Sequence, residues 1–459
     1  MRLRKGVYVQ GTSQFVNLVI RLSEVPLFLG YWGTERYGEW LILTAIPTYL
    51  AIGDGGFANA ACREMAIKSG AGDQHGVLVV FQSTFILLIV SSVMILFVAI
   101  GVMWLYPIDG YFTFNTLKIP EIETVLIILL LHVLVGFQGG LINGGFWVAG
   151  RYPFGLLLDM VIQLSEFSGL ALALIFGAGP IGAATGYLAG RFFGTGLLWI
   201  GQCHVSPWLQ YGYDYASFAV VRRLIKPALA SLAFPIGNAM NIQGLRILVG
   251  LTLGPANVAV FTTIRTLSRL IMQPRAILSV VVEPEMAVTH GKFDADLMQA
   301  LFLRSCQFAL WGCAVGVLIL FASAEWFFPI WTNSHITLSW SVLCVLVTSA
   351  LFNVIWFSAL IPVYATNRHI DIAIYYLFIY GLGSLIVAYL LVPLFGMIGI
   401  ALGLLVTEIL MTVIVLRASL RMLNISLSNW IRFVVKPPFI IAEYMFDNFH
   451  LIKIKNDDK

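Results

Sequence analysis

Residues 78–105 read LVVFQSTFILLIVSSVMILFVAIGVMWL and contain no charged side chain. A helix needs about 20 apolar residues to cross the hydrocarbon core of a bilayer. Of the 459 residues, 59% are hydrophobic and only 11% are charged, so lipid must cover much of the folded surface. Twelve apolar runs of this kind follow one another along the chain: 8–31, 37–62, 78–105, 122–148, 155–177, 180–203, 228–252, 256–282, 300–322, 338–362, 371–393 and 396–416.

Basic residues gather in every second connection between these runs. The connections after even-numbered runs and the two ends of the chain hold Arg2, Arg4, Lys5, Arg63, Lys68, Arg151, Arg222, Arg223, Lys226, Lys292, Arg368, Arg417, Arg421, Arg432 and Lys436. The opposite connections hold only Arg36 and Lys118. Because positively charged loops stay in the cytoplasm, we expect a multi-pass protein with both termini cytoplasmic.

The chain contains an internal repeat. The segments GPIGAATG (179–186) and GMIGIALG (396–403) match at an offset of 217, and Gly33 matches Gly254 at the nearby offset of 221. Since six spans separate the two copies, both copies enter the membrane from the same side. The predicted fold class is therefore an all-α polytopic membrane protein, with twelve transmembrane helices in two pseudo-symmetric six-helix bundles around a central cavity.

The repeat also predicts the domain organisation. We expect an N-terminal six-helix lobe (1–203), a cytoplasmic linker (204–227), a C-terminal six-helix lobe (228–420) and a cytoplasmic tail (421–459). Within the tail, residues 428–448 are apolar but are broken by Lys436-Pro437-Pro438, so they predict an interfacial segment rather than a thirteenth span.

Polar side chains recur at helical spacing inside several predicted spans. In the first span, positions 10, 14, 17, 21 and 24 form one continuous stripe. An Arg or Asp at the bilayer centre costs at least about 2.5–3.5 kcal/mol, so such groups must face one another or water. The candidates for a cavity lining are Asn17, Arg21, Glu24, Gln163, Glu166, Asn238, Asn241, Arg246, Arg265, Arg269 and Glu408.

The charge of this lining differs between the two halves. The C-terminal half carries Arg246, Arg265 and Arg269 against one acid, Glu408. The N-terminal half carries Arg21 and Arg191 against Glu24, Asp54, Asp159 and Glu166. Guanidinium groups match phosphate oxygens, so the cationic half suits an anionic ligand. The acids suit a coupling proton or sodium ion, and Glu24 and Glu166 are the best candidates by depth.

Structural ion pairing is the alternative explanation for these charges. Arg21 would then pair with Glu24, and Arg191 with Glu408, which occupies the equivalent position in the repeat. Asp54, within the Gly-rich stretch AIGDGG (51–56), has two open interpretations. It either lines the inner mouth of the cavity or bonds to nearby backbone groups or Arg63.

Two segments carry a resemblance to a known family. Residues 33–66 hold Gly33, Tyr37, Gly38, Asp54, Gly55 and Arg63, and residues 253–270 read LGPANVAVFTTIRTLSRL. They resemble the second and eighth spans of the Wzx-type oligosaccharide flippases, which share a superfamily with multidrug-and-toxin extruders. Arg265 stands at the family's usual basic position, whereas Ala259 and Phe261 depart from the Gly and Tyr that are common there.

The resemblance implies transport of an undecaprenyl-pyrophosphate-linked oligosaccharide, for O-antigen or exopolysaccharide synthesis, across a bacterial inner membrane by alternating access. Arg21, Arg246, Arg265 and Arg269 would bind the pyrophosphate. Membrane lipid and the polysaccharide polymerase machinery are the implied partners. No cofactor is expected apart from a coupling proton or sodium ion.

Two other functions stay open. A multidrug-and-toxin-type cation-coupled exporter would share the fold, but the three arginines of the C-terminal half argue against a cationic substrate. A membrane-embedded polysaccharide polymerase or glycosyltransferase would use large outward loops, whereas the longest here are about fifteen residues. We find no P-loop, no zinc-ligand spacing and no Ser-His-Asp set, so no enzyme, catalytic residue, metal site or nucleic-acid partner is predicted.

Overall fold

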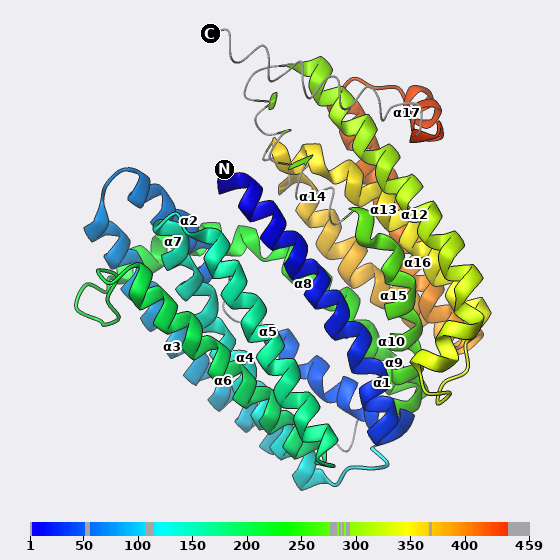
Figure 1. Cartoon of the computed structure of the whole chain (residues 1–459), viewed down its shortest axis with the longest axis horizontal. Coiled ribbons are helices and arrows are strands. Elements are labelled where there is room, and N and C mark those ends of the chain that lie inside the picture. Colours follow the sequence, from blue (N-terminus) through cyan, green and yellow to red (C-terminus); the bar gives the residue numbers. More distant parts are fainter. Residues whose placement is uncertain are drawn as a thin grey trace. The chain divides into compact units, whose positions relative to one another are not determined.

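The computed structural model describes residues 2–50, 56–105, 114–275, 282–283, 286, 289–290, 294–366 and 370–438. Every regular element in these ranges is helical (Figure 1). The elements are α1 (Arg2–Leu50), α2 (Phe57–Gly70), α3 (Gln74–Leu105), α4 (Ile119–Val148), α5 (Tyr152–Ile175), α6 (Pro180–Val205), α7 (Phe218–Ser231), α8 (Ala233–Ala239), η3 (Met240–Gly244), α9 (Leu245–Leu253), α10 (Pro255–Arg269), η4 (Leu270–Met272), α12 (Ala295–Trp331), α13 (Trp340–Ala365), α14 (Ile370–Tyr375), η5 (Tyr376–Gly383), α15 (Ser384–Phe395), α16 (Met397–Met422) and α17 (Leu427–Val434).

The chain divides into two compact units. The first contains Met1–Leu267, Glu325–Val345 and Ala373–Thr407, and the second contains Ser268–Ala324, Leu346–Ile372 and Glu408–Lys459. This division follows contact density, and the lobe boundaries at 203 and 228 stay predictions.

Seven helices in the described ranges are long and apolar enough to cross a membrane. They are Gln74–Leu105, Ile119–Val148, Tyr152–Ile175, Ala295–Trp331, Trp340–Ala365, Ile372–Phe395 and Met397–Met422. The regular elements in the described parts of the other predicted runs are helical too: α1, α2, α6, α7–α9 with η3, and α10 with η4. Several of these helices are less apolar or are interrupted. Charged residues lower the hydropathy of α1, and glycines lower that of α6. The π-helical η3 and the 3₁₀ turn η4 interrupt the runs 228–252 and 256–282.

Equivalent glycines interrupt the helical backbone at the same point of each half. Gly33 (φ 70°, ψ −176°) kinks α1 between the first and second predicted spans. Gly254 (φ 87°, ψ 168°) separates α9 from α10, between the seventh and eighth. A side chain is strained at such a backbone conformation, whereas glycine adopts it readily. The shared conformation supports the repeat at offset 221.

Glycines bring α5 and α6 into close contact in the first unit. Gly186, Gly190 and Gly194 recur every four residues on α6 and face α5. A Cβ atom at Gly190 would lie 2.3 Å from the Ser165 carbonyl oxygen, and one at Gly186 would lie 2.3 Å from that of Gly169. Small residues at this spacing let membrane helices approach backbone to backbone. The next residue after Gly190 is Arg191, so this contact holds its guanidinium beside α5.

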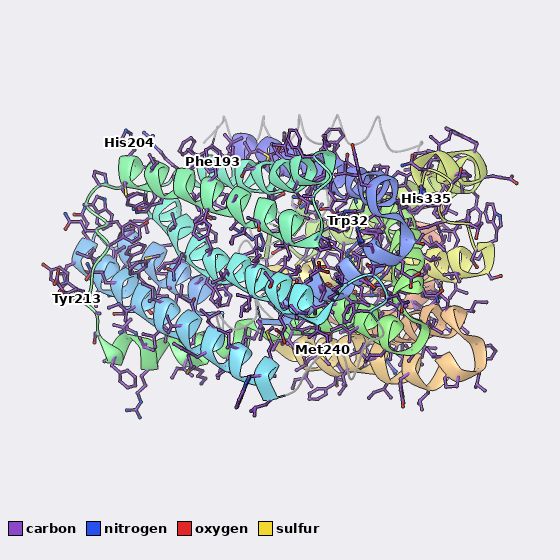
Figure 2. The ribbon with its side chains drawn as sticks, turned by 90° about the horizontal axis from the view of Figure 1, so that it is seen from below. Trp32, Phe193, His204, Tyr213, Met240 and His335 are labelled. Atoms are coloured by element: carbon purple, nitrogen blue, oxygen red, sulfur yellow. The ribbon has the colours of Figure 1, made fainter. Side chains whose placement is uncertain are left out.

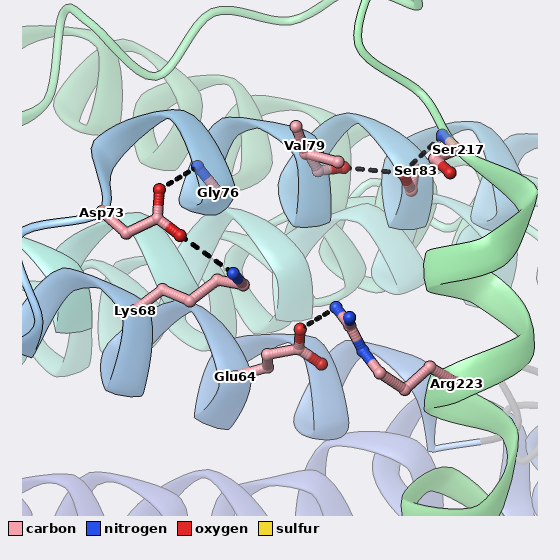
Figure 3. A network of polar contacts seen from close by, with 8 residues as sticks. All are labelled: Glu64, Lys68, Asp73, Gly76, Val79, Ser83, Ser217 and Arg223. Atoms are coloured by element: carbon pink, nitrogen blue, oxygen red, sulfur yellow. Dashed lines mark hydrogen bonds and ion pairs between the residues drawn. The ribbon is translucent and has the colours of Figure 1, made fainter.

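The predicted linker (204–227) is bound to α2 and α3 by hydrogen bonds and an ion pair. Gln82 on α3 donates to the Gln210 carbonyl (3.1 Å) and accepts from the Tyr215 N–H (2.9 Å), and Ser83 accepts from the Ser217 N–H (2.8 Å). Figure 3 shows the Ser83–Ser217 bond, and also the ion pair of Arg223 on α7 with Glu64 on α2. Figure 2 places Tyr213 of this linker at the opposite end of the first unit from His335. The polar groups of α2 and α3 thus determine the path of residues 206–223.

The last residue of α12 and the turn after it supply hydrogen bonds around a proline in α1. Pro26 has no N–H, so the Leu22 carbonyl four residues earlier lacks its helical donor. Trp331 Nε1 donates to this carbonyl at 2.7 Å, and Asn333 Nδ2 donates to the Pro26 carbonyl at 3.1 Å. Residues 325–345 therefore join the first unit through hydrogen bonds to α1.

Candidate functional site

A buried ionic network links α4, α5 and α6. Glu166 on α5 is only 7% exposed and receives Arg191 Nε at 2.6 Å. His132 Nε2 on α4 lies 2.9 Å from the same carboxylate oxygen and donates to it. The imidazole stacks on Tyr187, with ring centroids 4.0 Å apart and an interplanar angle of 17°. The Glu166 carboxylate is thus bound by a guanidinium and an imidazole, and the imidazole is held by an aromatic ring.

A second charged group lies on the polar stripe of α1. Glu24 is half-buried and lies within electrostatic range of Arg21, Arg246 and Glu166. The Arg21 side chain is exposed, and Arg246 on α9 is half-buried and donates Nη1 to Gln243 (3.1 Å). The first unit therefore brings together two of the four predicted phosphate-binding arginines and both of the preferred acids.

Arg265 has a different environment from these two arginines. Its side chain is 7% exposed, and it donates Nη1 to the Asn241 carbonyl (3.1 Å) and Nη2 to the Asn241 side-chain oxygen (2.6 Å). Asn241 lies in the π-helical turn η3, where the wider hydrogen-bond pattern makes a backbone carbonyl available to an outside donor. Asn241 in turn donates to the Tyr380 carbonyl (3.3 Å). Arg265 thus holds the π-helical turn in place.

Glu408 lies in the second unit and is 3% exposed. It accepts two hydrogen bonds from Asn353 Nδ2, both 3.0 Å, and one from Trp356 Nε1. In the first unit, the Arg191 guanidinium lies 3.5 Å from where a Cβ of Gly136 would stand. At the offset of 217, Gly136 on α4 corresponds to Asn353 on α13, and Arg191 on α6 corresponds to Glu408 on α16. The contact between α4 and α6 in the first half is therefore repeated between α13 and α16 in the second.

The remaining predicted lining residues are Asn17, Gln163, Asn238, Arg269 and Asp54. Asn17 donates to the Ser13 carbonyl (3.0 Å), Gln163 is half-buried, and Asn238 is exposed. Arg269 is half-buried and belongs to the second unit. Asp54 lies outside the described residues.

Sequence reasoning missed two members of the ionic network and one pairing. His132 and Tyr187 were not among the candidates, although a histidine inside LLLHVLV (129–135) is an unusual polar group in an apolar run. The ion pair of Arg191 is with Glu166, whereas the repeat suggested Glu408. Within the described residues, no group of three His, Cys, Asp or Glu side chains is arranged to hold a metal ion.

Comparison with solved structures shows which fold the chain has. No family model matches the chain, and no curated protein matches it. A solved structure described as the inward-facing conformation of a multidrug resistance MATE family transporter of the MOP superfamily has a TM-score of 0.70 and is 15% identical, covering 90% of this chain and 94% of its own. An outward-facing structure of such a transporter has a TM-score of 0.60 at 16% identity, covering 92% and 95%. A third, a MATE in a bent conformation, has a TM-score of 0.54 at 17% identity, covering 95% of each chain.

These likenesses extend over nine-tenths of the chain or more. MATE transporters have twelve membrane helices in two bundles, which is the number that the sequence predicts here. The predicted fold class is confirmed: the chain is an all-α polytopic membrane protein with the fold of the MATE transporters.

Proposed function

We propose that this protein is a flippase that moves a polyprenyl-pyrophosphate-linked oligosaccharide to the outer leaflet by alternating access. The observation that carries the proposal is the group of Arg21, Glu24 and Arg246, on two helices of the first unit. All three side chains keep accessible surface, and Glu24 lies within electrostatic range of both arginines. Accessible charges on membrane helices must face water or a polar ligand, because lipid would not solvate them.

The arginines supply the recognition of the diphosphate. Arg21 and Arg246 each offer planar donors that fit phosphate oxygens. An arriving diphosphate competes with Glu24 for these two guanidinium groups. Arg265 has a positioning role in this proposal, since it binds Asn241 and fixes the turn that precedes α9. The sequence-based assignment of Arg269 to the same ligand stays a prediction.

The acids supply the coupling. When the diphosphate binds Arg21 and Arg246, the Glu24 carboxylate becomes able to bind a cation. A proton or sodium ion bound to Glu24 would then link the ion gradient to export. Glu166 has a guanidinium and an imidazole as partners, so we assign it to holding α4, α5 and α6 together. The coupling ion therefore acts at Glu24 in this proposal.

The second candidate is a multidrug-and-toxin-type, cation-coupled exporter. The fold comparisons favour it, because two of the structures that share the fold are described as multidrug resistance transporters. Glu24 would then bind a cationic drug, and the arginines would only modulate that carboxylate. A third, enzymatic reading as a polymerase or glycosyltransferase has the weakest support, because all three fold comparisons are with transporters.

Deletion of the gene separates the three functions. We expect a complete sugar repeat unit on its polyprenyl carrier to accumulate, as measured by mass spectrometry of extracted lipids. Arg21→Gln and Arg246→Gln should each fail to restore surface glycan at wild-type protein level, whereas Arg36→Gln, on the same helix as Arg21, should restore it. Normal lipid-linked sugars together with new sensitivity to cationic drugs would support the exporter instead. Truncated sugars would support an enzyme.

A further inference from the structure

The C-terminal helix α17 is attached to α12 in a fixed orientation. Gln307 Nε2 donates to the carbonyls of Phe433 (3.3 Å) and Lys436 (2.7 Å), and Trp311 Nε1 donates to that of Val434 (3.2 Å). The carbonyls of Val434 and Lys436 lie at the C-terminal end of α17, where helical donors run out, and that of Phe433 also accepts from the Lys436 N–H (3.2 Å). Side chains of α12 thus cap the C-terminal end of α17.

This attachment lies at the edge of an apolar span. Arg304 is the last charged residue of α12 before residues 305–324, which carry no charge. Gln307 and Trp311 lie one and two turns beyond Arg304. Helix α17 therefore lies at the level where a bilayer changes from headgroups to acyl chains. Figure 1 shows α17 beside α12 near the end that carries the N-terminus of α12.

The helix has two apolar faces, and only one is used inside the protein. Trp430 and Val434 are 7% and 3% exposed. Leu427, Ile431 and Val435 recur every four residues and are 54%, 46% and 68% exposed. The second stripe suits the acyl boundary of a bilayer, as in helices that lie in the membrane surface.

Positive charges border this exposed stripe. Arg432 and Lys436 lie one turn apart and are both exposed, as are Arg417 and Arg421 near the end of α16 in the same unit. Residues 423–438 contain no acid that would cancel them. A row of cations beside a membrane-facing apolar stripe matches the phosphates of anionic lipids.

We propose that α17 and the end of α16 form a binding surface for anionic phospholipid of the inner leaflet. Leu427, Ile431 and Val435 enter the acyl boundary, while Arg432 and Lys436 bind the headgroup phosphates. Because α12 already fixes α17, lipid binding does not have to order the helix first. The proposal depends on the membrane fold and not on the transported substrate.

The test is lipid binding to the detergent-purified full chain, followed by native mass spectrometry. Dioleoylphosphatidylglycerol is the anionic probe, and dioleoylphosphatidylcholine is the neutral one. We expect wild-type protein to retain phosphatidylglycerol preferentially and Arg432→Gln/Lys436→Gln to bind it about 30-fold more weakly, since each surface cation contributes about fivefold. The charge-preserving Arg432→Lys/Lys436→Arg should bind as wild type.

A matched control separates location from net charge. Arg36→Gln/Lys118→Gln removes two positive charges on the opposite side of the predicted spans and should keep the preference. Equal retention of both lipids by wild type would overturn the proposal. So would an equal loss of binding in both Gln variants, or wild-type binding in Arg432→Gln/Lys436→Gln. A melting temperature close to wild type shows that each variant is folded, and Leu427→Ser/Val435→Ser provides a second, uncharged test with weaker binding of both lipids expected.

Discussion

Replacing Gly190 with alanine should separate α5 from α6. The new Cβ would lie 2.3 Å from the Ser165 carbonyl oxygen and 2.6 Å from the Glu166 backbone, whereas ordinary contact begins at 3.4 Å. Both neighbours are backbone atoms and cannot rotate away, so the helices must move apart by about 1 Å. Overpacking of this kind costs about 1–3 kcal/mol. The adjacent Arg191–Glu166 ion pair, at 2.6 Å, would lengthen with it.

The matched control is Gly196→Ala on the same helix. A Cβ there meets nothing within 4 Å. Alanine should therefore stabilise α6 by about 0.5–1 kcal/mol through its helix propensity. Thermal unfolding in detergent micelles, followed by tryptophan fluorescence, should give a lower midpoint for Gly190→Ala than for wild type, and an equal or higher one for Gly196→Ala. Equal midpoints for the two variants would refute the close-packing argument.

Three further changes test other contacts. Trp331→Phe removes the side-chain donor to the Leu22 carbonyl, which Pro26 deprives of its helical N–H, and should cost about 1–3 kcal/mol. Trp326→Phe, at a 62% exposed side chain, should leave the melting temperature nearly unchanged. Arg265→Gln and Asn241→Ala should each destabilise the protein. Because the two side chains contact each other, the double mutant should show a coupling energy of about 0.5–3 kcal/mol. Melting-temperature shifts that simply add would contradict the contact. Burial raises the pKa of Tyr211, in the linker, above its usual value of 10.0, so its contribution to stability is present below pH 10 and is lost as the pH rises further. Tyr211→Phe should therefore lose about 0.5–1.5 kcal/mol near neutral pH and show less alkaline unfolding above pH 10 in a pH series of melting curves.

The fold was predictable because its signal is local and repeated. Apolar runs of membrane length identify spans one by one, and the match of residues 179–186 with 396–403 indicates the repeat, with Gly33 and Gly254 as a further matching pair. The kinked backbone at both positions agrees with that alignment. What composition could not show is where the hydrogen-bond pattern changes to a π-helix, because η3 has no distinctive residue sequence.

The site was predictable in its composition but not in its pairings. Helical periodicity grouped Arg21 with Glu24, and the structure brings Arg246 into range of the same acid. Periodicity says which residues share a face, but it does not say what the face meets. Arg265 therefore looked like a ligand-binding residue, although its donors are directed to Asn241. The repeat related Arg191 to Glu408 as equivalent positions, and equivalent positions in two copies need not be neighbours.

The hydrogen bond from Trp331 to the Leu22 carbonyl has a consequence for how the protein is made. The two residues are 309 positions apart in the chain. At about 5–20 residues per second, the ribosome reaches the tryptophan roughly 15 to 60 s after α1 has been synthesised. During that interval the first helix enters the membrane with an unsatisfied backbone oxygen, so water, lipid headgroups or an insertion factor must supply a temporary donor. A truncated nascent chain that ends before residue 331 should therefore hold α1 less firmly than one that extends past it.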